Sequence, residues 1–151
     1  MTALTAPEIL AELPQQDPFL FVDEILEIDD ESIVAAYRFR EDHEFYRGHF
    51  PGNPVTPGVI LVEAMAQVGV VALGIHLLAR QSGIDEVRKV VTMFTDMQVD
   101  FTGVVRPGDR VITTGHKVFF RRLKLRSRVE MRLENGPIVC SGTLSGMGMR
   151  R

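Results

Sequence analysis

The chain has 151 residues, 45% of them hydrophobic, and a formal net charge of −3, which fits a single globular domain over residues 1–151 that can bury a continuous core. Its one cysteine, Cys140, excludes an internal disulfide, and the N-terminus lacks the basic start and apolar core of a signal peptide. We therefore expect a cytoplasmic protein, and the near balance of charge gives no indication of a nucleic-acid partner.

The first 40 residues predict a helix followed by two strands. Residues 5–13 have the spacing of a capping box at Thr5 and Glu8, with Pro7 in the first turn. Residues 19–28 and 32–40 are rich in β-branched and aromatic side chains, and the acidic stretch between them predicts a turn.

A segment rich in proline and glycine follows, and it contains a histidine. The sequence GHFPGNPVTPG (residues 48–58) cannot be a regular helix or a central strand, so it predicts a rigid loop that carries His49. A lone histidine in a loop is more often a hydrogen-bonded surface residue than a base. The other histidines, His43, His76 and His116, lack the spacing of metal ligands, and we expect no metal site.

Residues 59–79 are apolar and predict a long buried helix with Glu63 near its start. Burial disfavours the charged form of a carboxyl group and raises its pKa, so Glu63 is a candidate proton donor near neutral pH. Alternatively, Glu63 only caps the helix or forms an ion pair, with Gln67 satisfying it one turn later. The stretch is long enough to span a membrane, but Glu63, Gln67 and His76 lie within it, and we expect it inside the protein.

The rest of the chain predicts four more strands, at residues 90–101, 109–120, 121–133 and 137–147. In the third of these, apolar and basic residues alternate, as in a strand with one dry and one wet face. The glycines of GTLSGMG (residues 142–148) are expected to relieve crowding or form a bulge rather than bind phosphate. Together these elements predict an α+β fold, a curved antiparallel sheet of about five or six strands around one long central helix.

Charge is distributed unevenly along the sequence. Residues 23–44 carry nine acidic side chains, whereas residues 117–132 carry seven basic ones. The basic run either protects a sheet edge from aggregation or forms a surface for an anionic partner.

The string GHFPGNPVTPGVILVEAMAQ (residues 48–67) resembles the signature of the β-hydroxyacyl-acyl carrier protein dehydratases of type II fatty acid synthesis, which have the hotdog fold. LPQQDPFLFVDEILEI and DMQVDFTGVVRPGDRV resemble the segments before and after the helix of that family, so the resemblance covers nearly the whole chain. It implies dehydration of β-hydroxyacyl-acyl carrier protein thioesters to trans-2-enoyl thioesters in fatty acid or specialised lipid synthesis. No cofactor is implied beyond the phosphopantetheine arm that carries the substrate.

The resemblance also assigns the site. It implies that His49 and Glu63 are the catalytic pair, that Gly58 is an oxyanion-stabilising backbone position, and that Gln67 helps to hold Glu63. The chemistry agrees, because dehydration needs a base for the α-proton, an acid for the departing hydroxyl and a donor for the thioester oxygen. Acyl carrier protein is the implied partner, and the basic run supplies candidate docking residues: Lys117, Arg121, Arg122, Lys124, Arg126 and Arg128.

By the same resemblance the minimal unit is a homodimer in which His49 of one chain faces Glu63 of the other. A trimer of dimers is common in the family. A monomer would leave a long sheet edge uncovered, which is a liability in solution.

The chain departs from the family pattern in two places. Gln15, Gln16 and Asp17 replace the usual His-Arg-Tyr, and Thr56 replaces the usual Met. These changes bear on the acyl channel and on carrier-protein docking.

Two other functions remain as alternatives. In a hotdog acyl thioesterase a carboxylate would act as nucleophile or base on the thioester carbonyl. The GHFPG string disfavours this alternative, because hydrolysis does not need a histidine over the α-carbon. A noncatalytic acyl-binding or assembly subunit is disfavoured because His49 and Glu63 are both present.

Overall fold

The computed structural model describes residues 3–151, and it begins with the predicted helix, α1 (Ala6–Glu12). Thr5 is its N-cap, and both bonds of the predicted capping box are present. The Thr5 N–H donates to Glu8 Oε1 at 2.9 Å, and the Glu8 N–H donates to Thr5 Oγ1 at 3.3 Å. These bonds satisfy two of the backbone donors that a helix start leaves free.

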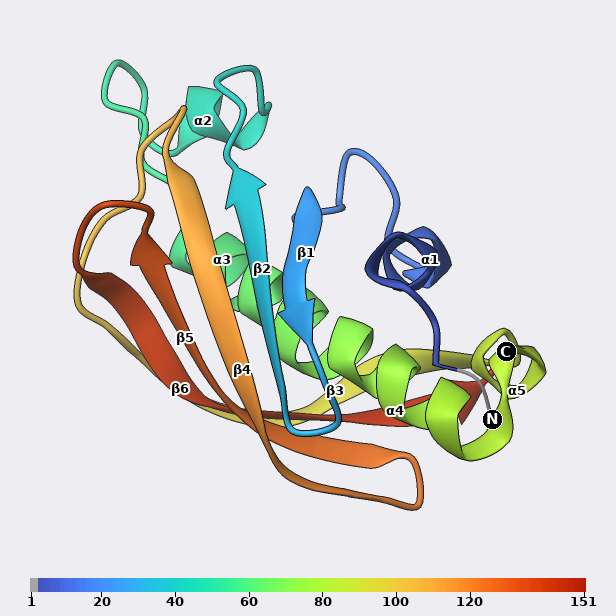
Figure 1. The fold of residues 1–151 in the computed structure, drawn as a ribbon. Helices are drawn as coiled ribbons and strands as arrows, with labels where there is room; N and C mark the ends of the chain where they lie inside the picture. The colour runs from blue at the N-terminus through green and yellow to red at the C-terminus, as the bar shows by residue number, and fades with distance from the viewer. Residues whose placement is uncertain (1–2) are drawn as a thin grey trace.

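Six antiparallel strands form one sheet in the order β1-β2-β4-β5-β6-β3 (Figure 1). The predicted α+β architecture is confirmed, with the sheet curving around one long helix. The strands are β1 (Glu24–Ile28), β2 (Ser32–Arg38), β3 (Val90–Phe101), β4 (Arg110–Arg121), β5 (Lys124–Leu133) and β6 (Ile138–Arg150).

Two strands begin at least three residues later than predicted, while β2 ends at Arg38 instead of residue 40 and β6 continues to Arg150 instead of ending at residue 147. Residues 19–22 are not part of β1, because the backbone of Phe19 and Phe21 bonds to the side chain of Gln67 instead of to a neighbouring strand. The predicted strand 121–133 begins only at Lys124, because Arg122 and Leu123 form a tight turn with φ of 51° and 65°. Such backbone angles suit a two-residue hairpin, but neither residue is the glycine or asparagine that usually indicates one.

The central helix runs from Gly58 to Ser82 in three consecutive parts: α3 (Gly58–Ala66), the π-helical turn η1 (Gln67–Ala72) and α4 (Leu73–Ser82). By length and composition it could cross a membrane, but 72% of its most apolar window is buried inside the protein. The prediction of a helix surrounded by protein is therefore confirmed. Two short helices, α2 (Phe45–Gly48) and α5 (Ile84–Val87), lie before and after it in the chain.

Glycines allow the helix and strands to approach one another closely. A Cβ atom on Gly146 would lie 2.7 Å from Val70 Cγ1, and one on Gly142 would lie 2.0 Å from the Gln98 carbonyl oxygen. The glycines of the GTLSGMG string thus relieve crowding, as predicted. The bulge nearby is in the facing strand β3, between Phe94 and Asp96.

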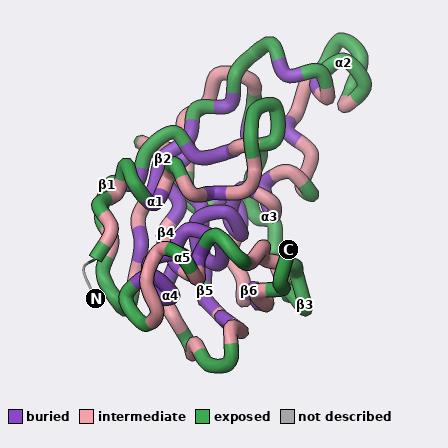
Figure 2. The backbone as a smooth tube through the Cα atoms, turned by 90° about the vertical axis from the view of Figure 1, so that its right-hand side faces the viewer, coloured by how far each residue is buried: buried purple, intermediate pink, exposed green. Residues whose placement is uncertain are grey.

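Apolar side chains from the inner face of the sheet cover the helix on both halves of its length. Figure 2 shows the buried backbone gathered around the helix and the inner strands, whereas β3 is largely exposed. This arrangement places the first turns of α3 beside the loop that carries His49.

Candidate active site

His49 caps the C-terminus of α2 and begins the proline-rich loop. Its Nδ1 lies 2.8 Å from the carbonyl oxygen of Val55, and the Val55 N–H donates to the His49 carbonyl at 2.9 Å. Phe50 and Asn53 exchange two further backbone bonds within the loop, of 3.2 and 2.8 Å. The loop therefore has defined internal bonds that orient the His49 ring.

The bond to Val55 determines which ring nitrogen of His49 can act as a base. A carbonyl oxygen only accepts hydrogen bonds, so neutral His49 carries its proton on Nδ1. This tautomer leaves the lone pair of Nε2 free to accept a proton.

Glu63 lies in the second turn of α3 and is half-buried. Burial is the larger influence and raises the pKa of its carboxyl group, while a hydrogen bond from Gln67 acts in the opposite direction. Gln67 Nε2 donates to Glu63 Oε2 at 2.8 Å. When the carboxyl group is protonated, Oε1 is left to carry the proton.

Gln67 is fully buried, and every polar atom of its side chain has a partner. Besides Glu63, Nε2 donates to the Phe19 carbonyl at 2.9 Å, and Oε1 accepts from the Phe21 N–H at 2.7 Å. Gln67 thus connects Glu63 to the segment before β1. Its position one turn after Glu63 predicted the first contact, but no sequence pattern indicated the two backbone contacts.

Gly58 is the first residue of α3, where backbone N–H groups have no partner within the helix. In the part of the chain that the structure describes, no acceptor bonds to the Gly58 N–H. A Cβ atom here would lie 3.1 Å from Cε1 of Phe101 in β3, so the glycine lets this ring approach the start of the helix. The Phe101 contact was not predicted.

The structure brings Glu63 and Gln67 into contact, but no hydrogen bond or ion pair joins His49 to Glu63 within residues 3–151 of one chain. The two side chains therefore do not form a bonded pair within one chain.

The residues that depart from the family pattern occupy two environments. Asp17 accepts a hydrogen bond from Arg40 Nη2 at 2.9 Å, and Gln16 Nε2 donates to the Leu13 carbonyl at 3.1 Å. Gln15 Oε1 is buried without a partner among residues 3–151. Thr56 is buried in the loop and bonds to Tyr46.

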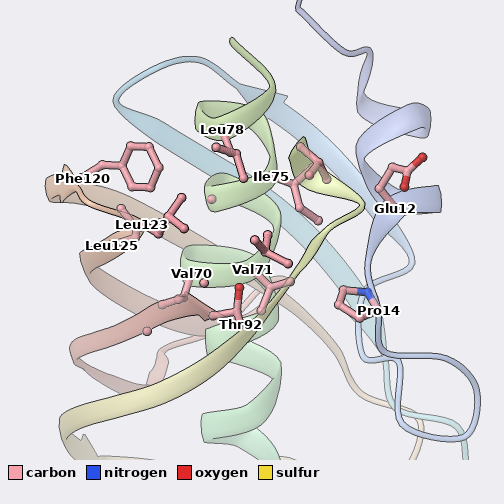
Figure 3. A pocket seen from close by; sticks show the side chains of 15 residues that line it. Glu12, Pro14, Val70, Val71, Ile75, Leu78, Thr92, Phe120, Leu123 and Leu125 are labelled. Atoms are coloured by element: carbon pink, nitrogen blue, oxygen red, sulfur yellow. The ribbon is translucent and has the colours of Figure 1, made fainter. Parts of the chain in front are cut away.

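An apolar cavity lies beside the second half of the central helix (Figure 3). Helix side chains including Val70, Ile75 and Leu78 line one wall, and Phe120 and Leu125 from the sheet line another. The lining residues with polar side chains are Glu12, whose carboxylate pairs with Arg88 at 2.8 Å, and Thr92.

The predicted docking residues fall into two groups. Lys117 pairs with Glu31 at 3.1 Å, while Lys124 and Arg126 pair with Asp96 at 3.4 and 3.3 Å. Within residues 3–151, three others have no acidic partner: Arg121, Arg122 and Arg128. The β4–β5 hairpin with Arg121 and Arg122 lies at the end of the sheet opposite α2 (Figure 1).

The remaining histidines are not grouped. His76 is a buried helix histidine whose Nε2 lies 2.8 Å from Asp30 Oδ1, and His43 is buried against Tyr37. In the described range 3–151, no group of three or more His, Cys, Asp or Glu residues could hold a metal ion.

Comparison with known proteins gives a consistent result. The family model for FabA-like domains matches residues 13–144. The chain is 37% identical over 146 residues to the 3-hydroxyacyl-acyl carrier protein dehydratase FabZ of Caldicellulosiruptor saccharolyticus, covering 90% of this chain and 92% of the relative. It is 42% identical over 112 residues to the FabZ of Geobacter metallireducens, covering 73% and 71%.

Solved structures resemble the fold at low sequence identity. A chain of the dehydratase heterocomplex ApeI:P from Xenorhabdus doucetiae superposes with a TM-score of 0.77 at 12% identity, covering 98% of this chain and 93% of that one. A thioesterase from Haemophilus influenzae superposes with a TM-score of 0.68 at 15% identity, covering 99% and 93%. These likenesses show the hotdog fold, which dehydratases and thioesterases share.

Proposed function

Because this chain belongs to the family of FabA-like domains, we propose that it dehydrates β-hydroxyacyl-acyl carrier protein thioesters with His49 as the base and Glu63 as the acid. The observation that carries the assignment of roles is the contrast between the two groups. Glu63 is half-buried with a raised pKa, whereas His49 is oriented with Nε2 free to accept a proton.

The reaction uses each group once. Nε2 of His49 takes the proton from the α-carbon, the electrons of that bond form the Cα–Cβ double bond, and the Cβ–O bond breaks. Glu63 gives its proton to the departing hydroxyl, which leaves as water. The Gly58 N–H, at the positive end of the helix dipole, faces the thioester oxygen and stabilises the negative charge that builds on it.

The acyl chain needs an apolar site that continues from Glu63. The cavity beside Val70, Ile75 and Leu78 lies further along the same helix, and its lining suits a hydrocarbon chain. No cofactor is required beyond the phosphopantetheine arm that carries the thioester. We further propose that the enzyme acts in the cytoplasm and that residues 1–151 form one domain.

The site is completed by a second copy of the chain. Strand β3 is an edge strand of 12 residues. It exposes four large apolar side chains: Met93, Phe94, Met97 and Phe101. A long apolar edge of this kind favours pairing with another chain. A homodimer in which His49 of one chain faces Glu63 of the other accounts for the missing bond between them within one chain, and dimers can assemble further into a trimer of dimers.

One assay separates the alternatives. We would add the protein to a crotonyl-acyl carrier protein substrate and follow the enoyl absorbance, with free thiol measured in parallel. A dehydratase working in reverse removes the enoyl absorbance without releasing thiol. Thiol release would indicate a thioesterase instead, and no change in either signal would indicate a binding subunit.

Docking of acyl carrier protein is tested through the basic residues. Arg121, Arg122 and Arg128 are free to meet acidic groups, whereas Lys117, Lys124 and Arg126 pair within the chain. Reversing Arg122 and Arg128 to Glu should raise the Michaelis constant for the carrier-protein substrate and leave that for a small thioester analogue unchanged. Added salt should have the same effect, since the Debye length falls from about 8 Å at physiological ionic strength to about 3 Å at 1 M.

The control for this experiment is the small thioester, which has no acidic surface. A Michaelis constant for the carrier-protein substrate that does not respond to salt would reject docking by the basic run. The residues would then serve to keep a sheet face solvated.

A further inference from the structure

A buried hydrogen bond between two side chains joins the ends of the loop that carries His49. The phenol oxygen of Tyr46 lies 2.6 Å from Oγ1 of Thr56. Tyr46 is 6% exposed and Thr56 is 3% exposed, so water does not compete for this bond. Burying two hydroxyl groups is costly unless they bond to each other or to another partner, which makes the pair a defined feature of the fold.

The two bonded residues flank His49 in the sequence, and Thr56 lies just before Gly58. Tyr46 belongs to α2, and His49, which caps the C-terminus of that helix, follows three residues later. Thr56 directly follows Val55, whose carbonyl oxygen orients the His49 ring, and it precedes Gly58 by two residues. A shift of Thr56 would therefore move both the acceptor for His49 Nδ1 and the N–H at the start of α3.

Both partners of the bond are attached to the rest of the protein. The Thr56 N–H donates to the carbonyl oxygen of Val105 at 2.9 Å. Tyr46 packs against Phe45 with 4.7 Å between ring centroids and against His43 with 6.3 Å. The position of the bond is thus determined by contacts outside the loop.

His43 connects this cluster to the sheet. It stacks on Phe45 at 4.8 Å, and its Nε2 lies 2.8 Å from the hydroxyl oxygen of Tyr37 in β2. Burial, and after it the charge of Arg40, lowers the pKa of His43 and favours a neutral ring. A neutral ring suits the largely aromatic surroundings.

We propose that Tyr46 and Thr56 are positioning residues, whose buried hydrogen bond sets the distance between the His49 ring and the Gly58 N–H. This inference rests on the proposed dehydration by His49 and Glu63. Both hydroxyl groups are buried and bonded to each other, so we assign them no direct role in the reaction. Thr56 is a position at which this chain departs from the family pattern. The hydrogen bond between Thr56 and Tyr46 is therefore a feature of this chain and not of that pattern.

The test compares variants that keep or remove the hydroxyl groups. Thr56→Val retains the shape of the side chain without its hydroxyl, Thr56→Ser retains the hydroxyl, and Tyr46→Phe removes the other partner. We expect Thr56→Val and Tyr46→Phe to lower kcat for hydration of the crotonyl thioester by about tenfold to a hundredfold, the scale of small misplacements in an active site. KM should stay within about twofold, and Thr56→Ser should recover most of kcat.

Ser127→Ala is the matched control. Ser127 is fully buried and donates to the Gly69 carbonyl at 2.6 Å, so the variant also loses a buried hydroxyl bond, but outside the loop. We expect it to lower the thermal midpoint while kcat, measured well below that midpoint, stays at the wild-type value.

The outcomes distinguish the two proposals. An inactive wild-type protein would overturn the proposed dehydration itself. An active wild type with a Thr56→Val variant that loses thermal stability but keeps full kcat would overturn the positioning role, as would a Thr56→Ser variant no better than Thr56→Val. If Thr56→Val does not fold, Tyr46→Phe removes the same hydrogen bond from the other side. A lowered kcat with a nearly unchanged KM in that variant would support the positioning role, and an unchanged kcat would overturn it.

Discussion

Glu63 illustrates, at the scale of one residue, how a proposed active site can act against stability. Its carboxyl group is half-buried in an apolar helix, and Gln67 is the one side chain that bonds to it among residues 3–151. Burial raises its pKa, which keeps the proton available for transfer but makes ionisation costly. The same property has separate consequences for turnover and for folding.

Replacing Glu63 by Gln should remove the acid, while the amide oxygen can still accept the hydrogen bond from Gln67. The amide has nearly the same shape as the acid but no dissociable proton. We expect turnover of the β-hydroxyacyl thioester to fall by about a hundredfold or more, with normal folding by circular dichroism. Turnover close to that of the wild type would assign the acid role to another group.

The same variant should change how stability depends on pH. Because the pKa of Glu63 is raised in the folded state, the folded protein binds this proton more tightly than the unfolded chain does. The stability that this bound proton contributes is fully present below pH 4.5, the ordinary pKa of a glutamate, and is lost as the pH rises through the raised pKa of the folded state. Glu63→Gln should therefore be more stable than the wild type at pH 7.5 and similar to it at pH 4.

Urea denaturation at the two pH values measures this difference. If the free energies of unfolding of variant and wild type differ by the same amount at pH 7.5 and at pH 4, ionisation of Glu63 has no cost in the folded state. The control is Glu8→Gln, whose carboxylate is exposed in the capping box and has a lowered pKa, so its effect on stability should have the opposite sign at neutral pH.

Some contacts of the proposed site could be predicted from the sequence and others could not, for a physical reason. Glu63 and Gln67 could be paired because residues four apart meet on one helix face, and this contact is present. Tyr46 and Thr56 lie ten positions apart across a loop, and no periodicity predicts that their hydroxyl groups meet. Contacts made by loop folding are set by tertiary packing, which the sequence pattern does not display.

At the scale of elements, the central helix approaches the sheet most closely at its π-helical turn. A Cβ atom on Gly69 would lie 2.5 Å from Cγ2 of Val129, and one on Gly115 would lie 2.9 Å from the Gly69 Cα atom. Ser127 donates to the Gly69 carbonyl at 2.6 Å in the same region. Helix and sheet are therefore in direct contact here, with no room for a side chain between them.

Gly69→Ala should destabilise the protein although alanine is the better helix former. The methyl group would overlap with the buried and branched side chain of Val129, and overpacking of this kind costs about 1–3 kcal/mol. Gly74→Ala in the same helix is the control, because its Cβ would lie at an ordinary 3.7 Å from Leu125. That variant should gain up to about 1 kcal/mol from helix propensity. Chemical denaturation of both would check the difference, and equal stabilities would argue that the contact between helix and sheet can relax.

The elements that could be predicted are those whose pattern is local. The capping box of α1 and the alternation of Leu125, Val129 and Met131 in β5 follow from spacing alone, and both are present. The π-helical turn could not be predicted, because it depends on how closely Gly69 meets the sheet. Residues 19–22 have strand composition, but the buried amide of Gln67 takes their backbone bonds.

At the scale of the whole molecule, the proposed site requires two chains. Strand β3 leaves an exposed apolar edge, and His49 and Glu63 of one chain do not bond to each other. The fold could be predicted from the long motif around the central helix. The homodimer stays a prediction that only the family resemblance offers, because a surface shared by two chains would combine residues far apart in sequence and leave no local pattern.

A mixture of two inactive variants tests the shared site. His49→Ala and Glu63→Gln homodimers each lack one catalytic group at both sites. After subunit exchange, a heterodimer would hold one site with both native groups and one site with neither, so about a quarter of wild-type activity is expected from a statistical mixture. Exchange is verified by native mass spectrometry, with wild type alone taken through the same procedure. Verified exchange without recovered activity would argue that each chain holds its own complete pair.

The burial of the central helix also has a consequence for synthesis of the protein. The helix Gly58–Ser82 is made before the strands β3 to β6 that cover much of it, which extend from Val90 to Arg150. At about 5–20 residues per second, the ribosome needs roughly 3 to 12 seconds to complete that segment. Throughout this interval the nascent chain carries an apolar helix without its cover, and chaperones that bind apolar segments should meet it then, before the last strand closes the sheet.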